Sequence, residues 1–277
     1  MFSGPTGARE TRRRSIPDFD LLPLAGSLNI SDKCNVLGYF ESLCQDSNAA
    51  NVLINSSLVA LYVKMLRNAK HDRLRVQLAS CLGLLLRHAT YISEELSKSG
   101  ILETLLEAAR DKSDQVRWGR RPALALELAA SGGCCCCSFV VQRRAKATCV
   151  QVRRRATATL GELLFYIATQ QQDLNEDGMG GQGGAAWQVP SSVLGQFVRM
   201  LRAGEDEVQQ HYAVKALENI STQPGDWGSR FASAEVLLSL VQIYHASKQD
   251  YLRSTALSTV ARILKRVPAL VSQVVDK

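Results

Sequence analysis

The stretch LRVQLASCLGLLLRH, residues 74–88, decides the fold that we expect for this chain. Its apolar residues recur at positions i, i+4, i+8 and i+11, counted from Leu74 to Leu85. This spacing places them on one face of an α-helix. Gly83 follows the central Leu82, and a small residue there would let a neighbouring helix approach closely. The stretch therefore predicts an amphipathic helix that packs against other helices.

Three further segments repeat this pattern. Two begin at Val152 and Leu252 and carry Gly161 and Ala261 at the position of the first glycine, and a looser copy begins at Val208. An amphipathic segment precedes each copy, at residues 57–67, 101–110, 191–202 and 234–245. An aspartate that could cap the helix N-terminus stands before three of the copies, at Asp72, Asp206 and Asp250, and Asp114 would do the same for the copy at Val152 only without the residues that separate them. The repeating unit is therefore a pair of helices joined by a short turn.

The length of the repeat indicates its class. The copies at Val208 and Leu252 lie 44 residues apart, whereas those at Leu74 and Val152 lie 78 apart. Without residues 116–151, a stretch of 36 residues, the longer interval shortens to 42. Both intervals then match the ~40–47 residues of HEAT and armadillo repeats, whose helix pairs must stack to bury their apolar faces. Because no alternating β pattern appears, we predict an all-α fold, a right-handed α-solenoid of stacked helix pairs.

The segment 116–151 looks foreign to the repeat. It lies between two copies of Gln-Val-Arg, and its excision joins Gln115 directly to Val152 without disturbing the pattern. Its first codon can begin with GT and its last can end with AG, as the ends of an intron do. We interpret it as a retained intron or a gene-model error, and a lineage-specific loop is the alternative. If it is translated, we expect it to be mostly disordered, with some helix near Arg143.

The rest of the chain divides into a tail and a repeat domain. We predict a disordered tail over 1–25 and a repeat domain over 26–277, interrupted by 116–151 and by a flexible, glycine-rich loop over 170–188. No apolar run approaches the ~18 residues that cross a bilayer. The N-terminus lacks the apolar core of a signal peptide. We therefore expect a cytoplasmic protein that does not bind membranes.

The charge of the chain gives little support to a nucleic-acid partner. The formal net charge is +7, but +5 of it falls within 116–151, which leaves +2 for the rest. Aromatic residues that could stack on bases make up 6% of the chain. We therefore expect no nucleic-acid binding. Cys34, Cys44 and Cys81 fit apolar helical patterns and are expected to be buried.

No motif of an active site, a cofactor site or a metal site stands out. The run 134–137 contains four consecutive cysteines, which cannot all turn toward one metal ion. Gly178, Gly180 and Gly183 match the G-x-G-x-x-G pattern, but an acidic polar run precedes them where a nucleotide-binding loop needs a strand. The signatures of kinases and P-loops are missing from the sequence. We therefore predict a chain that is not an enzyme, with no catalytic residue, cofactor, metal or small-molecule substrate.

A set of basic residues on the repeated helices is the candidate binding site. The second helices of stacked repeats often line one continuous surface, and a row of basic side chains there could bind an acidic segment of a protein partner. The alternative is a solvated helix face with no partner. The candidate residues are Arg75, Arg153, Arg154, Arg155, Lys215 and Arg253.

Four long stretches of the chain resemble one known family. They are residues 38–66, 74–115, 152–170 and 204–221. They are similar to the C-terminal helical-repeat region of the Fused-related, unc-51-like kinase four family, whose plant member is called RUNKEL. In that family a kinase-like domain, often degenerate, precedes the repeats, and this chain departs from the pattern because it carries no such domain. The resemblance implies a role in microtubule-linked processes, ciliary or cytokinetic, and a location at the cytoskeleton or cilium.

The residues and the resemblance together predict a non-catalytic scaffold for protein–protein interaction. The alternative is a C-terminal regulatory fragment of a serine/threonine kinase or pseudokinase, which acts only together with a kinase domain. An upstream exon with kinase motifs would favour that alternative.

Overall fold

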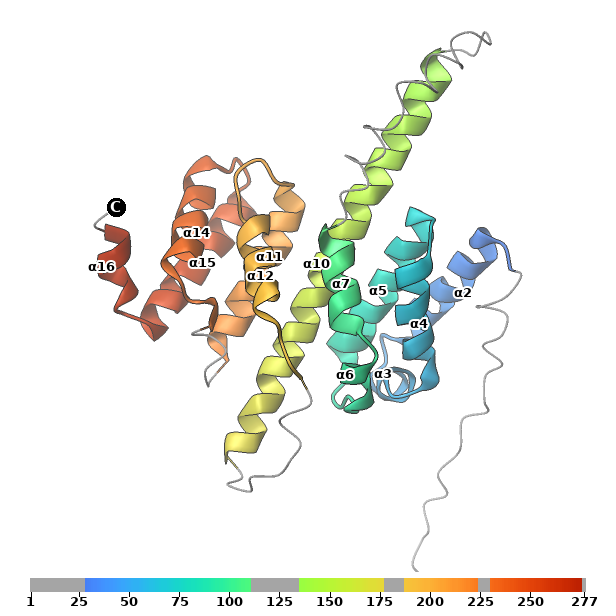
Figure 1. Cartoon of the computed structure of the whole chain (residues 1–277), viewed down its shortest axis with the longest axis horizontal. Helices are drawn as coiled ribbons and strands as arrows, with labels where there is room; N and C mark the ends of the chain where they lie inside the picture. The colour runs from blue at the N-terminus through green and yellow to red at the C-terminus, as the bar shows by residue number, and fades with distance from the viewer. Residues whose placement is uncertain (1–27, 111–134, 177–186, 224–229, 276–277) are drawn as a thin grey trace, which may run out of the picture.

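The computed structural model describes residues 28–110, 135–176, 187–223 and 230–275, and every regular element in these ranges is a helix. The all-α fold is therefore confirmed. In chain order, the larger helices follow one another along the long axis of the molecule (Figure 1). The helices are α2 (Ile30–Leu43), α3 (Ser47–Ile54), α4 (Ser57–Asn68), α5 (Asp72–His88), α6 (Glu95–Lys98), α7 (Ile101–Arg110), α10 (Cys135–Glu176), α11 (Ser191–Met200), α12 (Glu207–Thr222), α14 (Ala234–Ala246), α15 (Asp250–Arg266) and α16 (Leu270–Val275).

The helices form two rows. The four helices that carry the repeated pattern pack against one another in succession, α5 on α10, α10 on α12 and α12 on α15. We call them the second helices. The first helices α4, α7, α11 and α14 begin and end within two residues of the predicted segments, and each packs on the second helix of its own pair. The predicted stacking of helix pairs into a solenoid is thus confirmed.

Two short helices extend the predicted pair to three helices. α3 precedes α4 at an angle of 71°, and α6 precedes α7. HEAT and armadillo repeats contain two or three helices each, and a short helix before a pair is the third. We did not predict α3 or α6, because neither is long enough to show a clear apolar period in the sequence.

Polar side chains fix where several helices begin. The carboxylate of Asp206 accepts a hydrogen bond from the backbone N–H of Gln209 and caps α12, as predicted. Asp72 and Asp250 are instead the first residues of α5 and α15, where their negative charge suits the helix dipole although neither helix has a side-chain cap. The prediction for Asp114 lies outside the described residues.

The core is one continuous cluster of Leu, Ile, Val and Ala side chains between the two rows. The predicted apolar stripes lie within it: Leu78 and Leu82 of α5, and Leu160 of α10, are at most 1% exposed. The cysteines Cys34, Cys44 and Cys81 are free and buried, also as predicted.

The small residues of the pattern lie where second helices touch. A methyl group on Gly83 would come within 2.7 Å of the Thr159 hydroxyl oxygen, and one on Gly161 within 2.8 Å of the Ala216 methyl carbon. These glycines therefore let α5, α10 and α12 approach closely. Ala261 lies on α15, the last second helix, and is exposed.

Helix α10 begins earlier than the sequence suggests. It starts at Cys135, inside the stretch 116–151, and ends at Glu176, inside the stretch 170–188. Its amino-terminal part, green in Figure 1, extends beyond the neighbouring helices. Residues 135–151 are therefore helical, in agreement with the helix expected near Arg143. Residues 116–134 and the tail 1–25 lie outside the described ranges.

Candidate partner-binding surface

The second helices α5, α10 and α12 each have a stripe of unburied side chains along one face. Along α10 this stripe recurs every three or four residues, which is the period of one helix face. The stripe on α5 consists of Arg73, Gln77, Ser80, Leu84 and Arg87. That on α10 consists of Gln151, Arg155, Ala158, Glu162 and Phe165, and that on α12 of His211, Lys215, Asn219 and Thr222. Because the three helices pack side by side, their stripes form one surface, which we call the second-helix face.

Ion pairs join neighbouring helices near this face. The guanidinium group of Arg87 on α5 donates hydrogen bonds of 3.0 and 2.5 Å to Glu162 on α10. Glu218 on α12 accepts from Lys215 at 2.7 Å and from Ser258 on α15 at 2.7 Å. Burial raises the pKa of Glu218, but these two hydrogen bonds outweigh it, and the pKa lies below its ordinary value. Glu218 therefore stays ionised at neutral pH although it is buried.

Two of the six candidate basic residues lie on the second-helix face. Arg155 and Lys215 are exposed on adjacent helices. Successive residues of a helix point about 100° apart, so the run 153–155 cannot present three arginines to one partner. The structure thus narrows the candidate set, and binding by Arg155 and Lys215 stays a prediction.

The other candidates have neighbours within the chain. Arg75 lies 3.7 Å from the carboxylate of Asp72. Arg253 donates to the backbone oxygen of Tyr244 on α14 at 3.2 Å, and its guanidinium carbon lies 5.2 Å from the centre of the Tyr244 ring. Both arginines therefore contribute to packing within their own repeats.

Arg154 holds the start of α12. Its guanidinium group donates two hydrogen bonds, of 2.8 and 2.6 Å, to the two oxygens of the Asp206 carboxylate. Burial raises the pKa of Asp206, but the hydrogen bonds from Arg154 and from the Gln209 backbone and the charge of Arg154 outweigh it, so the pKa lies below its ordinary value. The bond to Asp206 in turn raises the pKa of Arg154. The pair is therefore fully charged at neutral pH and links α10 to α12.

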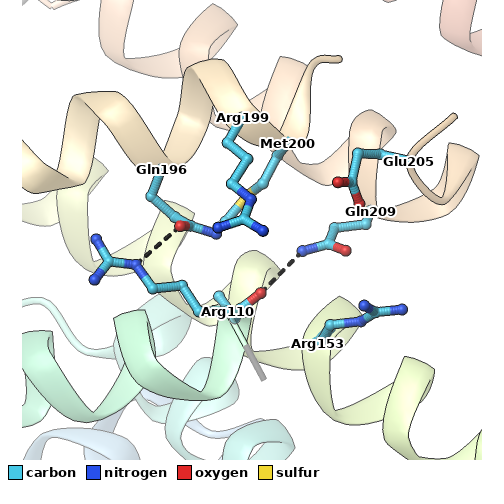
Figure 2. A pocket seen from close by; sticks show the side chains of 8 residues that line it. Arg110, Arg153, Gln196, Arg199, Met200, Glu205 and Gln209 are labelled. Atoms are coloured by element: carbon cyan, nitrogen blue, oxygen red, sulfur yellow. Dashed lines mark hydrogen bonds between the residues drawn. The ribbon is translucent and has the colours of Figure 1, made fainter. Parts of the chain in front are cut away.

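Arg153 points into a pocket between the two rows. The pocket is also lined by Arg110 at the end of α7 and by Arg199 on α11 (Figure 2). We did not identify Arg110 or Arg199 from the sequence. They are 43 and 46 residues away from Arg153 along the chain, and no local motif joins them.

The histidine and cysteine side chains were candidates for a metal site. Within the described ranges, no three His, Cys, Asp or Glu side chains lie close enough together to hold a metal ion. His211 packs edge-on against the ring of Tyr251 at 4.9 Å, and its Nδ1 is buried without a hydrogen-bond partner. Burial lowers the pKa of His211, and the positive charge of Lys215 lowers it further. The glycines 178, 180 and 183 and Cys134 lie outside the described residues.

In the described part of the chain, no single helix is long and apolar enough to cross a membrane, although α3 and α4 reach that length and composition together across their bend.

Two curated proteins are similar to nearly the whole chain. The serine/threonine-protein kinase RUNKEL of Arabidopsis thaliana is 34% identical over 261 residues, which are 92% of this chain and 16% of that protein. The serine/threonine-protein kinase ULK4 of Mus musculus is 26% identical over 245 residues, which are 88% of this chain and 16% of that protein. The chain thus spans a small part of the length of both relatives. No protein-family model matches it.

A solved structure supports the fold. A designed armadillo repeat protein in complex with the peptide (KR)4 matches with a TM-score of 0.56, over 90% of this chain and 86% of that one, at 14% identity. At this identity the match concerns the fold alone, and it agrees with the stacked helical repeats of this chain. The chain is therefore a homologue of RUNKEL and ULK4, with the armadillo-like fold expected of the C-terminal repeat region of that family.

Proposed function

We propose that the chain is a non-catalytic scaffold that binds an extended, acidic segment of a protein partner along the second-helix face. The observation that carries this proposal is the continuity of the face. Three second helices pack side by side, and their unburied stripes adjoin without an intervening helix. An extended segment laid across them would contact each repeat in turn, as solenoids commonly bind.

The charge of the face favours an acidic segment. Four of its side chains are cationic, Arg73, Arg87, Arg155 and Lys215, against one carboxylate, Glu162. Arg87 is paired with that carboxylate and Lys215 with Glu218, although each cation keeps more than half of its side chain exposed. Arg155 is exposed on the helix between them, so we choose Arg155 and its neighbour Lys215 for the test. The designed protein of the same fold is described as a complex with a peptide, (KR)4. That peptide is basic, whereas the cationic side chains of the second-helix face favour an acidic segment.

We further propose that the partner belongs to the microtubule machinery. The family resemblance supports this assignment, and it gives the cytoskeleton or cilium as the place of action. Electrostatic attraction to an acidic polymer would raise the association rate and would weaken with salt.

Co-sedimentation with polymerised tubulin tests the proposal. We expect the chain to pellet with the polymer, and we expect the double variant Arg155→Glu/Lys215→Gln to bind at least about threefold more weakly, since each rim charge contributes modestly. The matched control is Lys64→Glu/Lys98→Gln, which makes the same change of charge at exposed positions on α4 and α6. Equal binding by the two double variants would exclude the second-helix face. No binding by the unaltered chain at low salt would exclude tubulin.

A second function follows from the names of the relatives. Both are serine/threonine-protein kinases, and the chain corresponds to 16% of each. The repeats would then regulate a kinase or pseudokinase domain and act only together with it. Binding of the isolated kinase-like domain of RUNKEL to this chain, lost in Arg155→Glu/Lys215→Gln, would favour this function over a cytoskeletal partner.

A further inference from the structure

Three arginines from three helices surround one pocket on the edge of the solenoid. Arg110 ends α7, Arg153 lies on α10 and Arg199 on α11, and all three line the pocket together with Glu205 and the buried amides Gln196 and Gln209. Figure 2 shows Arg199 reaching down from α11 toward the space above Arg110 and Arg153. The pocket differs from the second-helix face, because it lies at the junction of the first and second helices.

Within the described ranges, the guanidinium groups in the pocket form no ion pair with a carboxylate. Arg110 donates to the side-chain oxygen of Gln196 at 2.9 Å and to the backbone oxygen of Ser192 at 3.3 Å, both uncharged acceptors. The Nε atom of Arg153 is buried and has no hydrogen-bond partner. Among the described residues, Glu205 forms no ion pair with any of the three arginines, although it is the one carboxylate in the lining. Three positive charges therefore face one negative charge.

The buried amides hold this arrangement in place. Gln209, 3% exposed, donates to the backbone oxygen of Ala109 at 3.3 Å and to the Thr157 hydroxyl at 3.1 Å, so it ties α12 to α7 and α10. Gln196, 5% exposed, orients Arg110 from α11. The helices that carry the pocket and the side chain of Arg110 are thus held in place by packing and by hydrogen bonds before any ligand arrives.

The size and the chemistry of the pocket select a small anion. Its space of about 30 Å³ is enough for a group of a few atoms. Guanidinium groups match the geometry of carboxylate and phosphate oxygens, and such charge-assisted hydrogen bonds are about twice as strong as neutral ones. A buried N–H without an acceptor is costly, and a bound oxyanion would supply the acceptor for Arg153.

We propose that this pocket binds an oxyanion, either a carboxylate or a phosphate group. When bound, the anion accepts hydrogen bonds from Arg153 and Arg199 and lies close to Arg110. The anion thereby holds α7, α10 and α11 together, because it offsets the mutual repulsion of the three arginines. The proposal is independent of the partner that occupies the second-helix face.

Thermal unfolding of the full chain at constant ionic strength tests the proposal, with inorganic phosphate and acetate as the probes and chloride as the reference. We expect saturating phosphate or acetate to raise the unfolding temperature by about 2–5 °C. A larger shift with phosphate assigns a phosphoryl ligand, and a larger shift with acetate assigns a carboxylate. Arg153→Gln and Arg199→Gln should each abolish the shift. Arg155→Gln should retain it, because Arg155 lies on the same helix but outside the pocket.

A second readout separates a ligand site from a purely structural cluster. In chloride, Arg199→Gln should unfold at the same or a higher temperature than the unaltered chain, because it removes one of three like charges. A lower unfolding temperature for Arg199→Gln in chloride would overturn the proposal. So would equal shifts by phosphate and acetate in the unaltered chain and in both pocket variants, since the anions would then act away from the pocket.

Discussion

The close approach of α10 and α12 can be tested by adding one methyl group. In Gly161→Ala, the new methyl carbon would lie 2.8 Å from the methyl carbon of Ala216, whereas carbon atoms in contact lie about 3.5–4.0 Å apart. The Ala216 methyl is attached rigidly to its helix, so α12 must move by about half an ångström or more. Overpacking of this kind costs about 1–3 kcal/mol, against a gain of about 0.8–1.0 kcal/mol from helix propensity.

The neighbouring glycines provide graded controls. Gly195 in α11 has no atom within 4 Å of its added methyl group, so Gly195→Ala should stabilise the chain by about 0.5–1 kcal/mol. In Gly83→Ala the methyl meets the Thr159 hydroxyl, which donates to the backbone oxygen of Ala79 at 2.7 Å. That hydroxyl can rotate away at the loss of one hydrogen bond, about 1 kcal/mol, so the net effect should be near zero.

Urea unfolding followed by circular dichroism measures the three variants. We expect stability to fall in the order Gly195→Ala, Gly83→Ala, Gly161→Ala, with a difference of about 1–3 kcal/mol between the first and the last. If Gly161→Ala were as stable as Gly195→Ala, the two helices would have to be further apart than described, and the reasoning about the repeated small residue would be refuted.

Further substitutions test the polar links of the solenoid. Asp206→Asn should keep the cap on α12 but lower stability by about 1–2 kcal/mol at pH 7. Because the folded-state pKa of Asp206 lies below its ordinary value, this difference should shrink in urea unfolding as the pH falls from the ordinary carboxyl pKa through the lower folded-state pKa, where Asp206 takes up its proton. The folded-state pKa of His211 lies below its ordinary value, so the imidazole of His211 binds a proton more readily in the unfolded chain than in the folded one. Stability should therefore fall as the pH drops below 6.5. In thermal melts at a series of pH values, His211→Gln should reduce this fall. Asn51→Ala removes an acceptor of the backbone N–H groups of Thr90 and Tyr91, at 2.8 and 3.1 Å, and should speed proteolysis of the segment after α5. Deletion of 116–151 should leave unfolding cooperative, since Gln115 joined to Val152 keeps the repeat in register; a broad, non-cooperative melt would contradict that register.

The extent of the helices was predictable because it depends on local pattern. The first helices α4 and α7 start at Ser57 and Ile101, as the spacing of their apolar residues indicated. The burial of the apolar stripes and the contact made by Gly161 followed for the same reason, since one face of an amphipathic helix must meet another. α10 is the exception, because it begins at Cys135, inside the stretch 116–151 that breaks the repeat and that we expected to be mostly disordered.

The direction of the basic side chains was decided by the tertiary structure. Positions 153, 154 and 155 are all arginine, yet the three side chains differ in their surroundings. Arg153 lines a pocket, Arg154 pairs with Asp206 and Arg155 is exposed. The periodicity of a segment indicates which of its residues share a helix face, but it does not indicate which residues of a neighbouring helix lie against that face. The sequence by itself determined the helices and the stripe that each of them buries, because apolar burial depends on the period within one segment. The pocket of three arginines and the second-helix face depend on helices distant in sequence, so only the stacking of the repeats decided them.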